Sequence, residues 1–447
     1  MLADDTKDRP LLGGAGSDAG ASILSCVINL SCTCMGTGIL ALPFAFSMAG
    51  FAAGSAILIF SAFVCVISLY MLVSSGRKLD GPVNFATLCV AALGPPAGIG
   101  IDLSVIANCL GTATSYLIVA ADCFSAAFDV SRSSVVLGAL VATSPAAFFR
   151  SMDTLKASST ISICCLVAIV LMVVIFGFGP TEDFDPCPKA PQVEHGHCGG
   201  SVTPLSTNGL RIFCTLPYFV MAFTCQQNAF NAIGELRNPT KGRQATVVMC
   251  TPILPTILYL TIAVCGYLTF GHRVPSNIIN GYPTSSPIVS AARCILGVVV
   301  LCNYPLQLFP CRGSALSLLD ACLKRSTQSS VLPGRDAADA TTPMPSNGAG
   351  GIFINGAREV RVTCVFHLTT GTIALFVTDL GALVAVVGST GSTVVALVCP
   401  ALAYALLSRA SASSLLFGEV TKSPLQAAAM LMLVLSAAVL PSSIFCS

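Results

Sequence analysis

The sequence predicts an all-α protein that crosses a lipid bilayer many times. Of its 447 residues, 54% are hydrophobic and only 9% are charged, whereas about a quarter of the residues in soluble domains are charged. The apolar residues form long continuous runs and do not alternate at every second position, which argues against a membrane β-barrel. The formal net charge of +2 lacks the basic excess of proteins that bind nucleic acid.

Eleven runs are long enough to be transmembrane helices, which need about 20 mostly apolar residues. They lie at approximately 23–48, 51–75, 99–121, 134–150, 157–179, 209–233, 245–270, 288–310, 361–378, 380–407 and 423–446. The fourth run is short, and a brief break near Asp379 separates the ninth from the tenth. We therefore expect eleven transmembrane helices.

The distribution of lysine and arginine predicts a cytoplasmic N-terminus. With this orientation 17 of the 22 basic residues fall in cytoplasmic segments and five fall outside, as the positive-inside rule requires. The first polar segment lacks the short apolar core of a cleavable signal peptide. The expected segments are a cytoplasmic tail at 1–22, five helices at 23–180, an extracytoplasmic loop at 181–208, helices six to eight at 209–311, a cytoplasmic loop at 312–360 whose Pro- and Gly-rich part is typical of disorder, helices nine and ten at 361–407, and the last helix with a short outer C-terminus at 408–447.

The first predicted helix is interrupted near its middle. Gly36, Gly38 and Pro43 lie within eight residues, and both residue types weaken a helix. Backbone without helical partners is costly in lipid unless it lines a cavity. The exposed N–H groups at the start of the second half-helix can bind a carboxylate.

The sixth predicted helix has a matching interruption. It contains Pro217 and a polar cluster from Thr224 to Asn228, and polar side chains at this depth usually face a cavity or another helix. Broken helices at corresponding positions of two halves indicate a transporter with an inverted repeat. The sequence therefore predicts a repeat of five plus five helices, with helices 1 and 6 broken and the eleventh as an addition.

Three motifs resemble the amino acid/auxin permease family, which lies within the amino acid-polyamine-organocation superfamily. They are the run Gly36-Thr37-Gly38-Ile39-Leu40-Ala41-Leu42-Pro43-Phe44-Ala45, the run Phe223-Thr224-Cys225-Gln226-Gln227-Asn228 continuing to Glu235, and the run Asn303-Tyr304-Pro305-Leu306-Gln307-Leu308-Phe309-Pro310. They occur in order in the first, sixth and eighth helices. The resemblance implies a LeuT-like fold and secondary transport of amino acids, usually coupled to protons or sodium.

The resemblance also implies a binding site. The substrate carboxylate and amine are expected at Gly36, Thr37, Gly38 and Ile39. The helix breaks and polar clusters suggest that Thr37, Thr224, Gln226 and Asn303 set the side-chain selectivity, and Phe223 is a further expected binding residue. Sodium-coupled members carry an asparagine where Cys32 stands, and a thiol is a poor ligand for a hard cation. Many members have histidine where Gln226 stands. We expect a proton-coupled symporter or a facilitative carrier, and the coupling ion stays open.

Three ionisable residues are candidates for gating or coupling, because charges in membrane helices are usually functional. Glu235 ends the sixth helix and resembles an inner-gate element, although a solvated helix end is the alternative. Histidine side chains titrate near physiological pH, which makes His367 a candidate, although a satisfied interfacial histidine is the simpler interpretation. Asp102 lies near the inner start of the third helix.

Most of the 22 cysteines lie in apolar runs, where they behave as small hydrophobic residues. Cys187 and Cys198 lie in the outer loop and form either a disulfide or two free thiols. No cysteine and histidine spacing resembles a zinc site, so no metal and no cofactor are expected. The sequence has no Walker loop and no Ser/His/Asp grouping, so it does not predict an enzyme.

Two alternatives to an amino acid transporter remain open. A polyamine or other amine carrier would need an acidic residue in its cavity, and no midplane acid stands out. An amino-acid sensor would bind the ligand without moving it, and would signal through the cytoplasmic tail or loop. The expected partners are an amino acid, the bilayer and a coupling proton. The plasma membrane and the membrane of an acidic organelle are both consistent with the sequence.

Overall fold

The computed structural model describes residues 20–79, 83–149, 156–178, 185–187, 198, 200–328, 354, 356–410 and 424–442. These residues are helical except for connecting segments, and their one β-type contact is an isolated bridge between Ala21 and Leu236. The all-α prediction is therefore confirmed for this part of the chain. Most of the predicted N-terminal tail, most of the predicted outer loop and the stretch 329–353, which was predicted to be cytoplasmic, lie outside these residues.

The part of the chain that holds the first five predicted runs contains seven helices. These are α1 (Ile23–Cys34), α2 (Gly38–Ala49), α3 (Phe51–Gly76), α4 (Phe85–Leu93), α5 (Pro95–Phe128), α6 (Arg132–Ala147) and α7 (Lys156–Phe178). The short helix α4 was not expected. Asn84 and Thr87 cap its first turn reciprocally, since each side chain accepts a hydrogen bond from the other's backbone N–H.

The later runs are more fragmented. They contain α8 (Gly209–Phe213), α9 (Leu216–Ala222), a 3₁₀ turn η3 (Gln226–Asn228), α10 (Ala229–Gly234), α11 (Lys241–Cys250), α12 (Ile253–Phe270), the 3₁₀ turns η4 (Gly271–Arg273) and η5 (Ile278–Gly281), α13 (Pro287–Gln328), α14 (Ala357–Phe376), α15 (Leu380–Val387), the π-helical segments η6 (Gly388–Ser392) and η7 (Val394–Val398), α16 (Cys399–Ala410) and α17 (Pro424–Val439). The predicted break near Asp379 is present, because this side chain accepts a hydrogen bond from Gly381 N at the start of α15.

Six helical stretches of the described residues are long and apolar enough to cross a membrane, and the bent pair α1 and α2 makes a seventh if it counts as one span. The other four predicted runs hold shorter, interrupted or more polar helices, among them α6 with 16 residues and α17 with 16 residues. The structure thus shows a polytopic helical membrane protein.

The end of the eighth predicted helix differs from the sequence prediction. Helix α13 continues as far as Gln328, so the region that was expected to begin the cytoplasmic loop at 312 is helical. Arg312 is buried inside this extension, and its Nη2 donates to the carbonyl oxygen of Phe149, 3.1 Å away. Tertiary packing therefore extends this helix beyond its apolar run.

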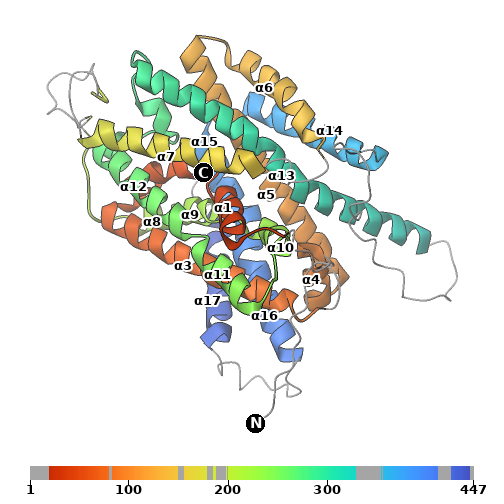
Figure 1. Cartoon of the computed structure of the whole chain (residues 1–447). Coiled ribbons are helices and arrows are strands. Elements are labelled where there is room, and N and C mark those ends of the chain that lie inside the picture. Colours follow the sequence, from red (N-terminus) through yellow and green to blue (C-terminus); the bar gives the residue numbers. More distant parts are fainter. Residues whose placement is uncertain are drawn as a thin grey trace.

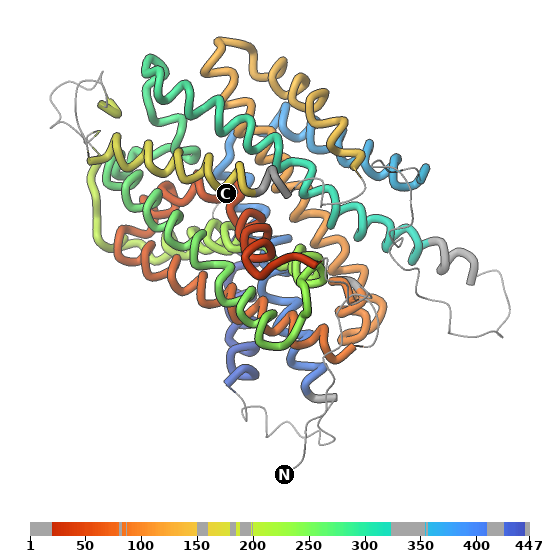
Figure 2. The backbone as a smooth tube through the Cα atoms, in the orientation of Figure 1, coloured from red at the N-terminus to blue at the C-terminus, as the bar shows by residue number. Residues whose placement is uncertain are grey.

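The interrupted helices lie in the middle of the bundle. In Figure 1, α1, α9 and α10 lie centrally, with α6, α13 and α14 along one side and α16 and α17 toward another. The colours of Figure 2 show the same mixing, because the earliest helices and the green middle of the chain pack together at the centre. The long helices α5 and α13 pack along each other.

Candidate functional site

A small polar cavity lies between the two interrupted helices. It is lined by Thr33, Cys34, Gly36, Thr37, Gly38, Asn108, Thr112, Met221, Thr224, Gln227 and Gln307. These residues come from the break between α1 and α2, from α5, from the broken sixth helix and from α13. Its lining contains no carboxylate, ammonium, guanidinium or imidazole group.

The break in the first helix directs backbone groups toward this cavity. Helix α1 ends at Cys34, α2 begins at Gly38, and the two half-helices are bent by 56°. The first N–H groups of a helix have no partner within it, and they carry the positive end of the helix dipole. Pro43 lies inside α2, so the glycines and not the proline mark the break.

The second interruption separates α9 from η3. Phe223, Thr224 and Cys225 connect the two elements. The hydroxyl of Tyr259 on α12 lies 2.7 Å from the carbonyl oxygen of Cys34 and 2.8 Å from that of Ala222. This one buried phenol therefore connects the last turns of both half-helices, α1 and α9.

The hydroxyls along the α1–α2 break are ordered by α5. Ser115 Oγ donates to the carbonyl oxygen of Thr112 at 2.6 Å and lies 2.5 Å from Thr37 Oγ1. Because a hydroxyl has one proton, Thr37 donates to Ser115. The lone pairs of Thr37 Oγ1 then remain as acceptors.

Asn108 is held from behind by the π-helical segment η6. Its Oδ1 accepts a hydrogen bond of 2.7 Å from Ser392 Oγ. Gly391 lies directly against the backbone of α5 at this level, since a Cβ atom there would be 2.7 Å from Asn108 N. Short π-helical segments are rare and occur frequently at functional sites.

Two amide oxygens in the cavity lining lack a protein partner. Gln227 Oε1 and Gln307 Oε1 are buried, and neither has a hydrogen-bond partner among the described residues. The Nε2 of Gln307 lies 3.5 Å from the hydroxyl of Tyr116, at the long limit for a hydrogen bond. Buried acceptors without partners are rare in proteins and require an explanation, and a ligand with N–H donors supplies one.

Only part of the predicted site lines this cavity. Gly36, Thr37, Gly38 and Thr224 do so, whereas Ile39 is buried in α2 outside the lining. Asn303 is also buried elsewhere, and its Oδ1 accepts a hydrogen bond of 3.0 Å from Ser162 Oγ of α7.

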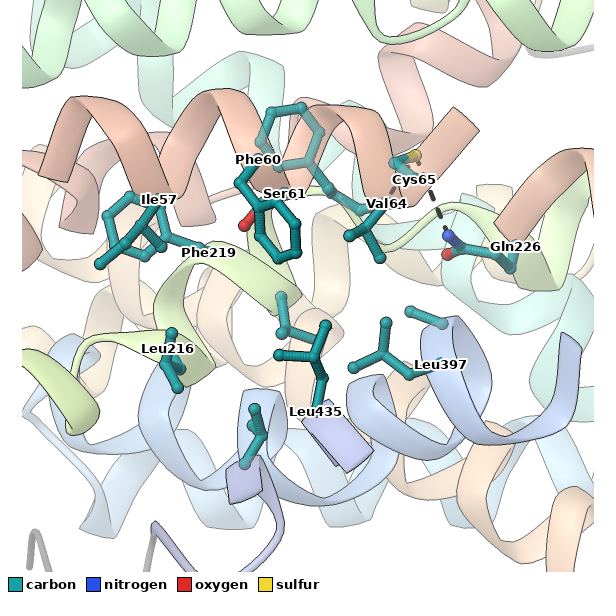
Figure 3. Close-up of a pocket in the computed structure, with 14 residues that line it drawn as sticks. Ile57, Phe60, Ser61, Val64, Cys65, Leu216, Phe219, Gln226, Leu397 and Leu435 are labelled. Carbon is teal, nitrogen blue, oxygen red and sulfur yellow. Dashed lines mark hydrogen bonds between the residues drawn. The ribbon is translucent and has the colours of Figure 1, made fainter. Parts of the chain in front are cut away.

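Phe223 and Gln226 lie in a second pocket, which is mostly apolar and lies between α3, the broken sixth helix, the π-helical segments and α17 (Figure 3). Gln226 Oε1 accepts a hydrogen bond from Cys225 N at 2.9 Å, and Gln226 Nε2 lies 3.9 Å from Cys65 Sγ. The Phe223 ring packs edge-on against Tyr259, with 5.2 Å between the ring centroids.

The three ionisable candidates lie apart from the polar cavity. Glu235 ends α10, and its carbonyl oxygen accepts a hydrogen bond of 2.7 Å from Ala21 N, which ties the chain before α1 to the end of the broken sixth helix. Asp102 is buried at the packing of α5 against α13, and its Oδ1 has no hydrogen-bond partner among the described residues.

His367 on α14 belongs to a hydrogen-bonded chain. Its Nε2 lies 2.8 Å from the carbonyl oxygen of Leu140, and its Nδ1 lies 3.0 Å from Tyr304 Oη. Tyr304 Oη in turn lies 2.7 Å from Thr370 Oγ1. The carbonyl of Leu140 requires a proton on Nε2. Thr370 Oγ1 also lies 3.0 Å from the carbonyl oxygen of Phe366, to which it donates, so Thr370 and His367 Nδ1 compete for the single proton of Tyr304.

The cysteine pair of the outer loop is joined. Cys187 and Cys198 form a disulfide, with 5.6 Å between their Cα atoms. Cys198 N also donates to the carbonyl oxygen of Thr269 at 2.9 Å. The structure contains the disulfide of the two alternatives, and this bond holds the segment on the end of α12.

The sequence analysis did not single out several cavity residues, chiefly Asn108, Thr112, Gln227 and Gln307. Each is a polar residue inside an apolar run, so a signal was present. Gln307 stands one helical turn after Asn303 in the same motif. The spacing alone does not tell which of the two amides faces the cavity.

The fold and the cavity together define a polytopic membrane protein whose interrupted helices enclose a small neutral polar site. A family model described as transmembrane amino acid transporter protein matches residues 19–445. The chain therefore belongs to this family, the amino acid/auxin permeases, as the three motifs indicated. Its members are transporters.

Curated relatives agree with this assignment. The chain is 31% identical to vacuolar amino acid transporter 5 of Schizosaccharomyces pombe, over 88% of this chain and 86% of that protein. It is 26% identical to vacuolar amino acid transporter 6 of Saccharomyces cerevisiae, over 86% and 89%. It is 21% identical to sodium-coupled neutral amino acid transporter 7 of Rattus norvegicus, over 82% and 75%. Amino acid transport is thus the activity that the relatives share.

Proposed function

We propose that this chain is a secondary transporter of zwitterionic amino acids that works by alternating access. The observation that carries the proposal is the chemistry of the polar cavity. Backbone N–H groups at the start of α2 are suited to a carboxylate, and the partnerless oxygens of Gln227 and Gln307 are suited to an ammonium group. A zwitterion presents both groups and has no net charge, as a cavity without charged side chains requires.

The same chemistry disfavours an amine carrier. A polyamine brings two or more positive charges and no carboxylate, and the cavity lining offers no acid to neutralise them. A sensor is distinguished from a transporter by flux and not by binding, so the two are separated by an uptake measurement.

Ligand binding to the purified protein tests the site directly. Three matched compounds are compared for thermal stabilisation: an amino acid, the amine that lacks its carboxylate, and the acid that lacks its ammonium group. We expect only the intact amino acid to stabilise the protein, and we expect Gln307→Leu to weaken this effect at least tenfold. Stabilisation by the amine alone would favour an amine carrier. Equal stabilisation of the wild type and of Gln307→Leu by the amino acid would contradict the proposal that Gln307 binds the ammonium group.

The transport cycle that we propose uses a five-plus-five inverted repeat with one added helix, in the LeuT-like arrangement of eleven spans. Two features support it. The helix breaks occur at the first position of each proposed half, in α1–α2 and in the α8–α10 region, and the third helices of the halves, α5 and α13, pack along each other. Backbone pairing of Ala21 with Glu235 supports an inner gate at the end of α10.

For coupling, we propose a proton or no ion at all in preference to sodium. Cys32 is a buried thiol at the position where sodium-coupled members carry asparagine, and Ser31 Oγ already donates to the carbonyl oxygen of Thr251 at 2.7 Å. His367 is a side chain of α14 that is hydrogen-bonded through both ring nitrogens, and we propose it as the residue that carries the coupling proton, since histidine is the side chain suited to that role.

For the membrane, we propose that of an acidic organelle, with the N-terminus in the cytoplasm. The vacuolar relatives and the distribution of lysine and arginine support this placement. Fluorescence from a tag at the N-terminus, quenched or retained as the lumen is acidified, tests both parts. A tag that responds to luminal pH would contradict the orientation.

A further inference from the structure

Three cysteines far apart in the sequence meet at the two helix breaks. Cys34 is the last residue of α1, Cys225 lies in the break before η3, and Cys65 lies in the middle of α3. Their sulfur atoms all lie within 4.8 Å of one another, and the residues are 3%, 0% and 2% exposed, in that order. Within the described residues, this is the one group of three or more His, Cys, Asp or Glu side chains that is compact enough to hold a metal ion.

The spacing of the sulfurs fits one soft metal ion. A metal–sulfur bond of about 2.3 Å places three sulfurs around a single ion about 4.0 Å apart by trigonal geometry. The observed limit of 4.8 Å therefore needs only a small contraction. Thiolates select Cu(I) or zinc over hard cations, and structural zinc usually takes four ligands. The group supplies three sulfurs and no further His, Cys, Asp or Glu side chain as a fourth ligand. This favours Cu(I) over zinc.

The backbone around the sulfurs also favours a cation. The carbonyl ends of α1 and α9 converge here, since one Tyr259 hydroxyl lies within 2.8 Å of both Cys34 O and Ala222 O. Helix C-termini carry partial negative charge. Cys65 Sγ also lies 3.4 Å from the carbonyl oxygen of Phe223. The Phe223 carbonyl thus places partial negative charge beside Cys65, and the C-terminus of α1 places it at Cys34.

The three thiols lie between the polar cavity and the apolar pocket described above. Cys34 lines the polar cavity, and Cys65 lines the apolar pocket of Figure 3, where Gln226 lies beside it. Cys34 is thus the member of the group that borders the polar cavity. We propose that Cys34, Cys65 and Cys225 form a Cu(I) site that locks the two broken helices to α3.

A bound ion would restrict helix movement, because the three sulfurs belong to three different elements. Alternating access requires broken helices to move against neighbouring helices, and an ion held by sulfurs on α1, α3 and the sixth-helix break links all three. Binding replaces thiol protons: one Cu⁺ with one thiolate and two thiols is neutral and releases one proton, and each further thiolate releases another. Because a buried net charge is costly, the neutral form is expected. Copper should therefore inhibit transport.

The test counts copper on the purified, reduced, full-length protein. Cu(I) is added without oxygen, in competition with a coloured Cu(I) chelator, to the wild type, Cys65→Ser, Cys225→Ser and the control Cys265→Ser. Cys265 is a buried cysteine of α12 outside the group. We expect Cys65→Ser and Cys225→Ser each to hold one copper fewer per chain than the wild type, while Cys265→Ser holds the same number.

In liposomes, Cu(I) should inhibit the wild type at a concentration at least tenfold lower than it inhibits Cys65→Ser, whose hydroxyl can still donate to Phe223 O. Equal copper numbers in all four proteins would overturn the site, as would a disulfide found between two of the three cysteines in place of bound copper. Tight binding of Zn²⁺ without Cu(I) would overturn the choice of metal. Copper binding is measured without any transport assay. Its result is therefore independent of whether the proposed transport function is correct.

Discussion

Gly391→Ala should distort the candidate site indirectly, by displacing the part of α5 that carries cavity residues, because Gly391 itself does not line the cavity. Gly391 lies in the π-helical segment η6, and a Cβ atom there would be 2.7 Å from Asn108 N, 2.9 Å from Ser104 O and 3.0 Å from Asn108 Cα. Ordinary contact begins at about 3.4 Å, so α5 must move away by roughly 0.7 Å. The contacted atoms are backbone atoms of a helix, and no flexible side chain can absorb the shift.

The displaced part of α5 carries Asn108 and Thr112 of the cavity lining. Overpacking of this kind destabilises a protein by about 1–3 kcal/mol, and a misplacement near 1 Å can lower the rate at a site about 100-fold. We expect Gly391→Ala to reduce amino acid uptake at least tenfold and to lower the stability in detergent by an amount within that range.

Uptake into liposomes and thermal unfolding measure the two effects. The matched control is Gly100→Ala on α5, because a Cβ atom at Gly100 meets nothing within 4 Å and alanine favours a helix over glycine by about 1 kcal/mol. The control should transport normally and be as stable as the wild type or more so. Wild-type uptake and stability in Gly391→Ala would refute the contact between η6 and α5 on which this reasoning depends.

Three further changes have expected outcomes. Tyr259→Phe removes the hydroxyl shared by the carbonyls at the ends of α1 and α9 and should cost about 1–3 kcal/mol of stability, measured by thermal unfolding; an unchanged unfolding curve would contradict the shared contact. His367→Gln should abolish the dependence of uptake on a proton gradient while substrate exchange continues, and retained proton-driven accumulation would exclude this residue from coupling. Cys187→Ser opens a loop closed by residues 11 apart and should lower the stability by up to about 3 kcal/mol; Cys198→Ser should match it, and a difference between the two would point to a role for one thiol alone.

The sequence could predict the first break because it is local. Gly36 and Gly38 are the residues that weaken a helix in lipid, and the structure ends α1 and begins α2 around them. The disulfide also depends on local features, since Cys187 and Cys198 are close in a polar loop. Features that arise from a few neighbouring residues can be deduced without the fold.

The cavity lining could be predicted only in part, because it depends on how whole helices are rotated. Asn303 and Gln307 are both polar amides on α13. Only the packing of this helix determines that Asn303 bonds to Ser162 and that Gln307 lines the cavity. The π-helical segment has no local signal beyond small residues. The group of Cys34, Cys65 and Cys225 is not visible in the sequence at all, because three distant elements must meet to form it.

The central claim is that the polar cavity carries amino acids across the membrane. Uptake of labelled amino acids by the purified protein in liposomes, under imposed proton or sodium gradients, tests it most directly. We predict amino acid uptake that does not depend on sodium, with accumulation under an inward proton gradient, and its loss in Gln307→Leu. Specific amino acid binding with no flux under any gradient would contradict transport and favour a sensor.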